Sequence, residues 1–405
     1  MNTKKQILAL VAFSSLFISC TKNDIDIVPQ NYTIPDTYTF DRNSTTSVDY
    51  SGQSSRISML QEMGDYYKTQ ATAGNEVNET VLNNMYSNSG NPFSSTDLNT
   101  SGKQLKDKTA ASTDYFTLLY GGGSTVEQAS VRTFFQTQFT QGNNASLGNN
   151  AAVGVAGKYL DGTSTRLFAA NGLEPQQVVL KGMMGASFMD QIANNYLSVN
   201  KLDAGTNVID NTNKVVEAGK NYTTMEHNWD EAYGYIYGGD IASTNSFKFW
   251  SSYINQVNND TDFNTLKAAI DLAFRKGRAA IVANDYTTRD AQIAIIKEKL
   301  ALVPAVRAVF YLQEGKAKLI TDNGAKAFHA LSEGYGFIMS LRYTNKPGTN
   351  NPYFTKTEVD TMLNSLISGP NGLWDIDNIS PKLDAISAQI ATKFGFTVAQ
   401  AATVN

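Results

Sequence analysis

The only two histidines of the chain stand in two copies of one short motif. His227 and Glu231 belong to the first copy, and His329 and Glu333 stand 102 residues further along. The ten-residue stretches that begin at these histidines share His, Glu, Tyr, Gly and Ile at the same five positions. On a helix, residues four apart project from one face. Imidazole and carboxylate suit Fe, Zn or Mn, so two pairs brought together predict a divalent metal site.

Two further acids stand beside the first pair. Glu226 and Asp230 are again four apart, on a neighbouring stripe of the same helix. We expect them to act as additional metal ligands or to support the ligands.

A structural role is the alternative interpretation of the repeat. Each His–Glu pair would then be an interaction that locks its helix, with Tyr and Gly packed at a close helix crossing. The distance between the His227 and His329 rings separates the two interpretations: a few ångströms would mean a shared site. The repeat also suggests an internal duplication, which is two helical bundles or two halves of one.

Aromatic residues surround both copies. Those that could stack on a glycan or peptide are Trp229, Tyr233, Tyr235 and Tyr335. Aromatics at helical spacing also pack a core, so both roles stay open. A ligand on this surface would quench the fluorescence of Trp229 or Trp250.

No complete catalytic signature occurs in the sequence. His-Glu-x-x-His and Gly-x-Ser-x-Gly are both absent, and Cys20 is the only cysteine. We therefore name no catalytic residue and expect a protein that is not an enzyme. A metal-dependent hydrolase is the second alternative, because such a site needs an open coordination position.

The first residues read as an export signal. Lys4 and Lys5 precede the short apolar run 7–18, which is shorter than the about 20 residues of a spanning helix. The run ends in Leu-Phe-Ile-Ser-Cys, a lipobox-like pattern that predicts cleavage after residue 19 and acylation of Cys20. Residues 20–36 are polar and read as a tether. The expected location is the cell envelope, with the lipid anchor in the outer membrane. The periplasmic face and the cell-surface face both remain possible.

Composition excludes some partners. A net charge of −4 and a pI near 5.4 argue against nucleic acid. The predicted membrane partner is therefore reached through the lipid anchor alone.

The hydrophobic pattern predicts a mainly α protein. Hairpins are expected at 38–50 and, through an Asp-Gly turn, at 157–169. We divide the mature chain into a helical region with β-hairpins, 37–173, and a helical region with the repeated motif, 174–405. Helical spacing begins near Ile57 and recurs in the segments 76–86, 103–119, 124–140, 174–198, 222–237, 245–256, 262–283, 288–311, 322–343, 355–367 and 379–394.

Several of these stretches resemble a known family. The segments that carry the resemblance are Tyr50-Ser51-Gly52-Gln53, the start of the hairpin at 154–157, Lys181-Gly182-Met183-Met184-Gly185-Ala186 and, most specific, Trp229-Asp230-Glu231-Ala232-Tyr233-Gly234-Tyr235. They resemble a lipoprotein family of Bacteroidota that is known only as domain of unknown function 4856. The resemblance covers nearly all of the mature chain and implies no chemistry.

A more distant resemblance is to imelysin-like proteins, which are envelope proteins tied to iron uptake. A duplicated helical bundle with a His/Glu motif is similar to theirs. Their motif is usually Gly-x-His-x-x-Glu, whereas here the acid is four residues after the histidine. This resemblance implies an imelysin-like bundle and an outer-membrane uptake receptor as partner.

Together these features predict a non-enzymatic envelope lipoprotein that binds a metal ion or metal complex in support of iron or nutrient uptake. A glycan- or peptide-binding surface lipoprotein is the first alternative.

Overall fold

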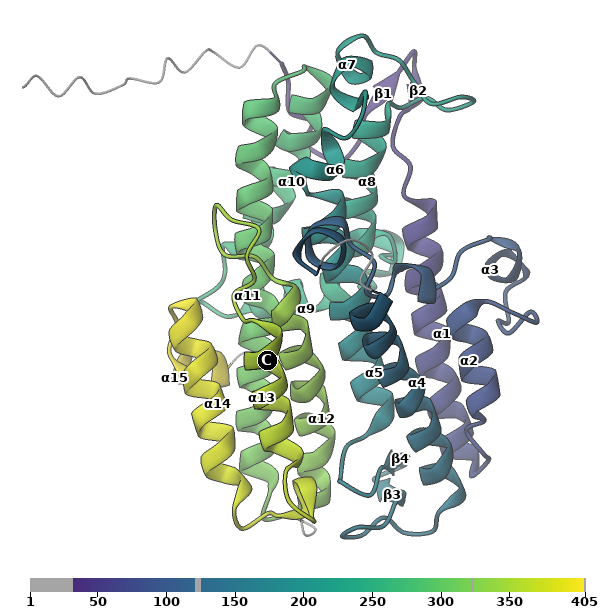
Figure 1. The fold of residues 1–405 in the computed structure, drawn as a ribbon, viewed down its shortest axis with the longest axis vertical. Helices are drawn as coiled ribbons and strands as arrows, with labels where there is room; N and C mark the ends of the chain where they lie inside the picture. Colours follow the sequence, from purple (N-terminus) through teal and green to yellow (C-terminus); the bar gives the residue numbers. More distant parts are fainter. Residues whose placement is uncertain (1–31, 121–124, 322–323, 404–405) are drawn as a thin grey trace, which may run out of the picture. The chain divides into compact units, whose positions relative to one another are not determined.

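The computed structural model of the chain describes residues 32–120, 125–321 and 324–403. Residues 34–405 form one compact unit, and the description below concerns this unit. Its long helices run side by side (Figure 1). The α-helices are α1 Ser51–Ala73, α2 Glu79–Ser87, α3 Thr96–Thr100, α4 Thr125–Leu147, α5 Pro175–Met183, α6 Val199–Leu202, α7 Asn207–Thr212, α8 Thr224–Tyr237, α9 Phe249–Asn259, α10 Leu266–Val282, α11 Tyr286–Lys318, α12 Ala325–Ser340, α13 Lys356–Ile367, α14 Ile379–Phe394 and α15 Val398–Ala402.

Tighter and wider turns connect these helices. The π-helices are η2 Thr113–Leu119, η3 Met184–Met189 and η4 Ile192–Tyr196, and the 3₁₀ turns are η1 Lys106–Lys108, η5 Ala242–Thr244, η7 Leu341–Tyr343 and η8 Gly372–Trp374. The segment 174–198, predicted as one helix, is therefore α5 followed by two π-helices. The segment 103–119 contains only η1 and η2. A sequence period of 3.6 does not distinguish a π-helix, which is widened by one residue per turn.

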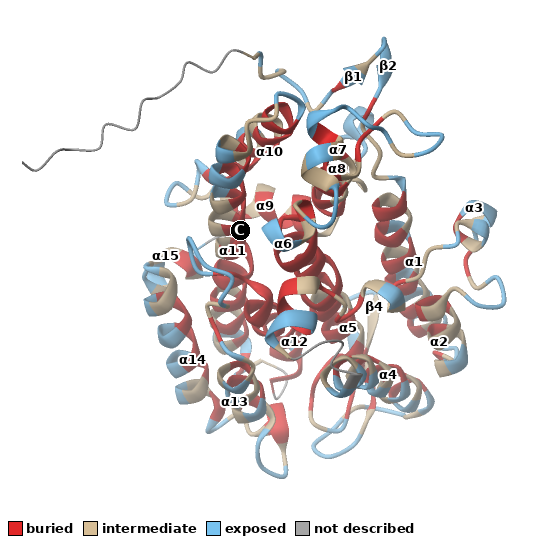
Figure 2. Ribbon diagram, turned by 45° about the horizontal axis from the view of Figure 1, so that its top comes forward, coloured by how far each residue is buried: buried red, intermediate tan, exposed pale blue. Residues whose placement is uncertain are grey.

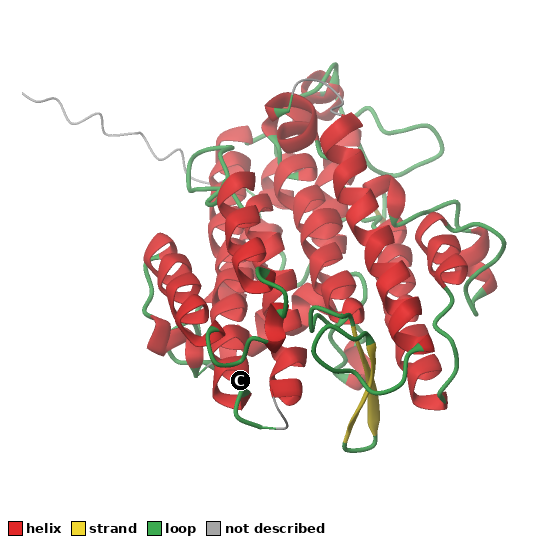
Figure 3. Cartoon of the chain, turned by 60° about the horizontal axis from the view of Figure 1, so that its bottom comes forward, coloured by secondary structure: helices red, strands yellow, loops and turns green. Residues whose placement is uncertain are grey.

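Two antiparallel hairpins complete the fold. Strands β1 (Asp41–Arg42) and β2 (Thr45–Thr46) form the first. In the second, β3 (Gly157–Asp161) pairs with β4 (Ser164–Phe168), and Figure 3 shows it at the edge of the helices. Gly162 in its turn has a φ of 62°, which glycine adopts without strain. The predicted mainly helical bundle with small hairpins is confirmed.

The core lies between the inward faces of the long helices, where the buried residues gather (Figure 2). Helix α11 has 33 residues and packs on α9, α10, α12, α14 and α15. At 1.5 Å per residue it is roughly 50 Å long. Helix α12 packs between α11 and α5, while α8 packs on α1 and α10. The helices that carry the two motifs thus lie against the middle of the fold.

Candidate functional site

Each motif copy lies on one helix, as predicted. Helix α8 begins with a capping box, because Thr223 Oγ1 accepts a hydrogen bond from the Glu226 amide while the Glu226 carboxylate accepts one from the Thr223 amide. Helix α12 begins after Gly324, whose φ is 85°. These starts fix the rotation of both helices and hence the face on which His and Glu lie.

His227 is held by the chain segment just before α1. Its Nδ1 lies 3.1 Å from the carbonyl oxygen of Asp49, so this nitrogen carries the proton and donates. Its ring stacks on Tyr222 at 4.4 Å between centroids. Nε2 faces Glu231 Oε1 at 3.9 Å, and Glu231 accepts a hydrogen bond of 2.8 Å from the Gln53 amide on α1.

Glu226 and Asp230 are committed to a buried cationic centre. Both carboxylates pair with Arg278 on α10, at 3.2 Å and 2.9 Å, and the side chains of all three residues have no exposed surface. Arg42 adds a two-pronged contact to Glu226 at 2.8 and 2.9 Å. Tyr38 donates a hydrogen bond of 2.6 Å to Asp230. Arginine thus already neutralises both acids, and their role as metal ligands or as support for the ligands stays a prediction.

The pKa values of the two acids in this centre shift in opposite directions, because burial and the arginine charges balance differently. Burial raises the pKa of Asp230 above its usual value despite the attraction of Arg278. For Glu226 burial also acts upward, but Arg278 and Arg42 outweigh it and lower the pKa. The acid with two arginine partners is thus the one whose pKa is lowered.

His329 occupies a different electrostatic setting. Its Nδ1 lies 2.7 Å from Glu174 Oε2 and 2.7 Å from Arg166 Nη1, and Arg166 lies 3.6 Å from Glu174. Because arginine only donates and a carboxylate only accepts, a protonated Nδ1 donates to Glu174, and the Arg166 contact is then not a hydrogen bond. Nε2 faces Glu333 Oε2 at 3.7 Å, and Glu333 pairs with Lys181 of α5 at 3.1 Å. This histidine thus lies between two carboxylates, each of which has its own cation.

These neighbours change the pKa values of the pair. Burial would lower the pKa of His329, but Glu174 and then Glu333 outweigh it and raise the pKa. Burial would raise the pKa of Glu333, and Lys181 and His329 reverse that effect and lower it. Both changes favour a charged imidazolium next to a charged carboxylate, and an imidazolium cannot bind a metal until it loses a proton.

The two motif copies make the same kinds of contact with neighbouring helices. Each His Nδ1 meets the N-terminal end of a neighbouring helix, Asp49 before α1 and Glu174 before α5. A Cβ added to Gly234 would approach Tyr50 to 2.3 Å, and one on Gly336 would approach Lys181 to 2.4 Å. The motif glycines therefore permit the close crossing that the structural interpretation predicted.

The likeness between the two copies includes a second contact with a glycine. Trp229 and Leu331 hold the same motif position, and each packs on a glycine of another helix, Gly277 of α10 and Gly315 of α11. Helix α10 follows the first motif helix in the chain, whereas α11 precedes the second. The likeness of the two copies is thus local packing and does not extend to the order of the helices.

The two His–Glu pairs use separate polar partners. Those of the first pair come from Asp49 and α1, and those of the second from Glu174, β4 and α5. In residues 32–120, 125–321 and 324–403, no group of three or more His, Cys, Asp or Glu side chains is arranged to hold a metal ion. The polar partners of each pair are those expected for the structural role.

The four predicted ligand-binding aromatics divide into two kinds. Trp229 and Tyr235 have no exposed surface, and the Trp229 indole donates to the Phe274 carbonyl at 3.0 Å. Trp250 is equally buried and donates to the Met184 carbonyl. These three rings pack in the core, and the expectation that a ligand meets Trp229 or Tyr235, or quenches Trp229 or Trp250, stays a prediction.

Tyr233 and Tyr335, which hold the same motif position, each line a cavity. The Tyr335 pocket lies between α4, α12, η7 and α13 and has a volume of about 170 Å³. Its lining residues are Glu127, Ser130, Val131, Phe134, Tyr335, Met339, Arg342, Tyr343, Lys356, Val359, Asp360, Leu363 and Asn364. The Tyr233 pocket has a volume of about 290 Å³ and is lined by Tyr38, Tyr233, Tyr237, Asp240, Lys267, Asp271 and Arg275 among others.

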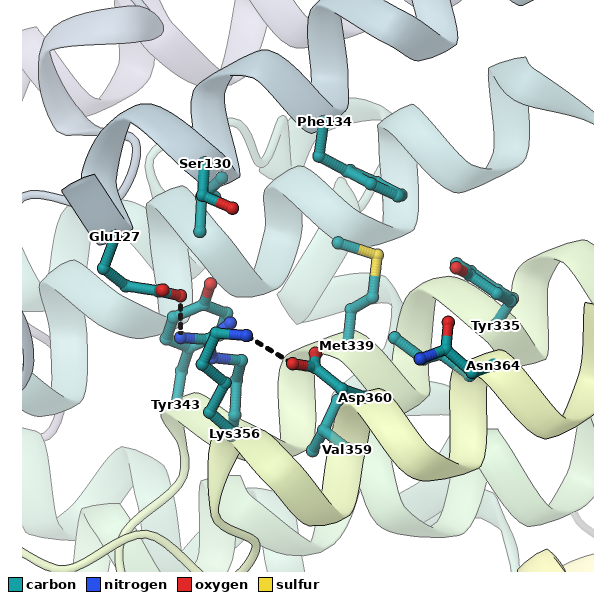
Figure 4. A pocket seen from close by; sticks show the side chains of 13 residues that line it. Glu127, Ser130, Phe134, Tyr335, Met339, Tyr343, Lys356, Val359, Asp360 and Asn364 are labelled. Carbon is teal, nitrogen blue, oxygen red and sulfur yellow. Dashed lines mark hydrogen bonds and ion pairs between the residues drawn. The ribbon is translucent and has the colours of Figure 1, made fainter.

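The Tyr335 pocket combines an apolar wall with charges of both signs. Figure 4 shows Phe134, Met339 and Tyr335 on one part of the pocket and two ion pairs on another. In one pair Arg342 Nη2 lies 2.6 Å from Glu127, and the other joins Lys356 to Asp360. Tyr335 is 4% exposed, and burial together with Asp360 raises its pKa. Its phenol therefore stays protonated and can donate to a ligand.

The Tyr233 pocket is more aromatic and more acidic. Tyr38 stacks on Tyr233 with ring centroids 3.6 Å apart, and the centroid of the Tyr237 ring lies 4.8 Å from that of Tyr233. The Tyr237 hydroxyl donates to Asp271. Stacked rings beside carboxylates are typical of walls that bind sugar C–H faces and hydroxyls.

Sequence reasoning missed most of the partners that hold the motifs. Arg278 and Arg166 carry no local signal, because nothing in a helical or strand pattern marks a cation whose acid is far away in the chain. Glu174 did have a signal for its place at the start of α5, since it precedes Pro175.

The predicted lipid-attachment site Cys20 and its signal segment 1–19 lie outside the described residues. Among the described helices, none combines the length and apolar character that a membrane crossing requires.

Comparison with known proteins places the chain in a family. No curated protein and no solved structure matches it. A family model described as a domain of unknown function (DUF4856) matches residues 35–397, which is nearly the whole of the compact unit. The chain thus belongs to the DUF4856 family.

Proposed function

We propose that this chain is an exported lipoprotein, anchored in the outer membrane through Cys20, that binds a small nutrient in the Tyr335 pocket without transforming it. The observation that carries the proposal is that the repeated motif places a tyrosine at a cavity in both copies. The histidine and glutamate of each copy tie the motif helix to its neighbours, and the tyrosine two positions after the glutamate is left at a pocket.

The lining of the pocket offers contacts for the apolar side chain and the charged ends of a short peptide. Phe134, Met339 and Leu363 provide an apolar wall. Burying one leucine-sized side chain there would contribute about 1.5–3 kcal/mol. Arg342 and Lys356 can receive a carboxylate, and the acids paired with them can receive an ammonium group. A zwitterionic ligand would therefore exchange partners within existing ion pairs instead of leaving a charge unpaired.

Calorimetric titration with the dipeptide leucyl-leucine tests this proposal. Tyr335→Phe should weaken binding about 3- to 10-fold, because one hydrogen bond contributes roughly 0.5–1.5 kcal/mol. Tyr233→Phe, the same change at the matching motif position, should leave the affinity unchanged. N-acetyl-leucine amide, which has no charge, should bind at least 10-fold more weakly than the dipeptide.

Two results would overturn the peptide assignment. One is the absence of dipeptide binding to the wild-type protein. The other is binding of a probe such as maltose that depends on Tyr233 and not on Tyr335, which would move the ligand to the Tyr233 pocket and favour a glycan.

Metal binding is the second candidate. What favours it is that each His donates Nδ1 to an oxygen and turns Nε2 toward a carboxylate, at 3.9 Å for His227 and 3.7 Å for His329. Metal-ligating histidines commonly show this pattern. In this case the protein would hold Fe, Zn or Mn and pass it to an outer-membrane uptake receptor.

Anaerobic titration with Fe²⁺, Zn²⁺ and Mn²⁺ tests the metal candidate. If the two histidines bind a metal, we expect stoichiometric binding that is lost after His227→Ala plus His329→Ala. Binding that is weaker than millimolar, or that survives the double substitution, would eliminate the paired-histidine site.

A further inference from the structure

A buried lysine faces a third cavity, far from both motifs in sequence. Lys297 lies on α11 and is 8% exposed. Its ammonium group makes no hydrogen bond or ion pair with any residue in the described part of the chain. Most of the side chain is covered, but Nζ is not among the fully enclosed polar atoms and keeps contact with the cavity. A lysine this covered is usually paired with an acid.

The cavity at Lys297 has a volume of about 290 Å³. One face of α11, made by Asp290, Ile293, Ala294 and Lys297, forms one side, since these residues follow the 3–4 spacing of a helix. Leu197 and the loop 346–350 supply other walls. The site therefore offers the largely covered Lys297 beside apolar side chains, with Asp290 and the exposed Lys346 also in its lining.

No carboxylate in the described part of the chain lies within ion-pair distance of this cation. Asp290 is already paired with Arg289 at 2.8 Å. Asp114 of η2 attracts Lys297 from further away; its Oδ1 accepts from Ser198 and Asn200, and its buried Oδ2 has no hydrogen-bond partner among the described residues. Lys346, in the loop, has the same sign as Lys297 and is exposed. Burial outweighs the attraction of Asp114 and lowers the pKa of Lys297 to about 8.

We propose that this cavity binds a small organic carboxylate with an apolar body, whose carboxylate pairs with Lys297. The carboxylate would supply the partner that the folded chain does not, and the apolar body would lie against Leu197 and Ile293. This site is separate from the Tyr335 pocket, so it stands or falls independently of the proposed function.

Calorimetric titration at pH 7 with hexanoate, and with the neutral hexanamide as a matched probe, tests the proposal. Hexanoate should bind the wild-type protein at least 10-fold more tightly than hexanamide. Lys297→Met should lower hexanoate affinity at least 10-fold, while Lys346→Met, the exposed lysine of the same cavity, should change it less than 3-fold. Tyr335→Phe should have no effect.

Two further readouts keep the test decisive. Thermal unfolding of Lys297→Met should occur at the wild-type temperature or above it, because the substitution removes an unpaired buried charge. Hexanoate affinity of the wild-type protein should fall as the pH rises through 8, where Lys297 loses its proton. No hexanoate binding, equal binding of hexanamide, or unchanged affinity of Lys297→Met would each overturn the proposal.

Discussion

At the scale of single residues, the two histidines have similar geometry and different hydrogen-bond partners. His227 donates to a neutral backbone carbonyl, and His329 donates to the carboxylate of Glu174. Glu174 and Glu333 raise the pKa of His329 against the effect of burial. The protonated form of His329 is therefore more favoured in the folded chain than in the unfolded chain.

This difference predicts a pH-dependent contribution to stability. A raised folded-state pKa contributes stability that is fully present below the unfolded value of about 6.5 and is lost as the pH rises through the folded value. The stability difference between the wild-type protein and His329→Gln should therefore shrink between pH 5.5 and pH 8.5. Urea unfolding at four pH values measures it. In a Glu174→Gln background the pH dependence should largely disappear; a difference that grows with pH would contradict the assignment.

Arg278 is the residue whose loss should cost the most. Replacement by Met would leave Asp230 and Glu226 buried with their main cation removed, and breaking a buried ion pair costs about 3–5 kcal/mol. Lys318→Met removes a cation from an exposed pair with Glu314 and should cost under about 0.5 kcal/mol. Chemical denaturation of both variants checks the contrast, and equal losses would show that the Arg278 centre adds little.

At the scale of elements, hydrophobic periodicity predicted most of the helices well. The long segments near 222–237, 355–367 and 379–394 became α8, α13 and α14 with ends shifted by two residues or fewer. The second hairpin followed from its Asp-Gly turn. The π-helices and the short helices α6 and α7 were not predicted, because such short segments do not show a recognisable hydrophobic period. The first hairpin formed at 41–46, inside the predicted segment, because Asn43 and Ser44 adopt the positive φ of the turn.

The candidate site was predictable only in part. The His–Glu spacing gave the correct helix face, because four residues on a helix fix it. The partners of the motif side chains were not predictable, because tertiary packing brings Asp49, Arg278 and Glu174 to them. The aromatics show the same limit: four looked equivalent in the sequence, and only Tyr233 and Tyr335 reach a cavity.

Helix crossings at glycine give an element-scale prediction. A Cβ on residue 277 would lie 2.1 Å from Trp229 Cζ2, so Gly277→Ala forces α8 and α10 apart. We expect a loss of about 1–3 kcal/mol, typical of overpacking. Gly334→Ala, inside α12, meets Leu312 no closer than 3.3 Å and should change stability by less than about 1 kcal/mol. Equilibrium unfolding in urea compares them, and a neutral Gly277→Ala would contradict the close crossing.

At the scale of the whole molecule, the compact unit begins at residue 34, shortly after the segment that would carry the lipid. Cys20→Ser should therefore leave the fold intact and release the protein from membranes. Fractionation of cells, with palmitate labelling of the wild-type protein, measures this. Persistence of Cys20→Ser in the membrane fraction would show that something other than the lipid holds the protein there.

The distance in sequence between motif and partner also sets the order of events in time. Asp49 and His227 are 178 positions apart, and Glu174 and His329 are 155 apart. A chain that emerges from its N-terminus can pack α1 and α5 on each other and on α4 and β4, but the faces that meet α8 and α12 stay uncovered until those helices appear. Contacts of such long range slow folding. The interactions that hold both motifs in place thus form late.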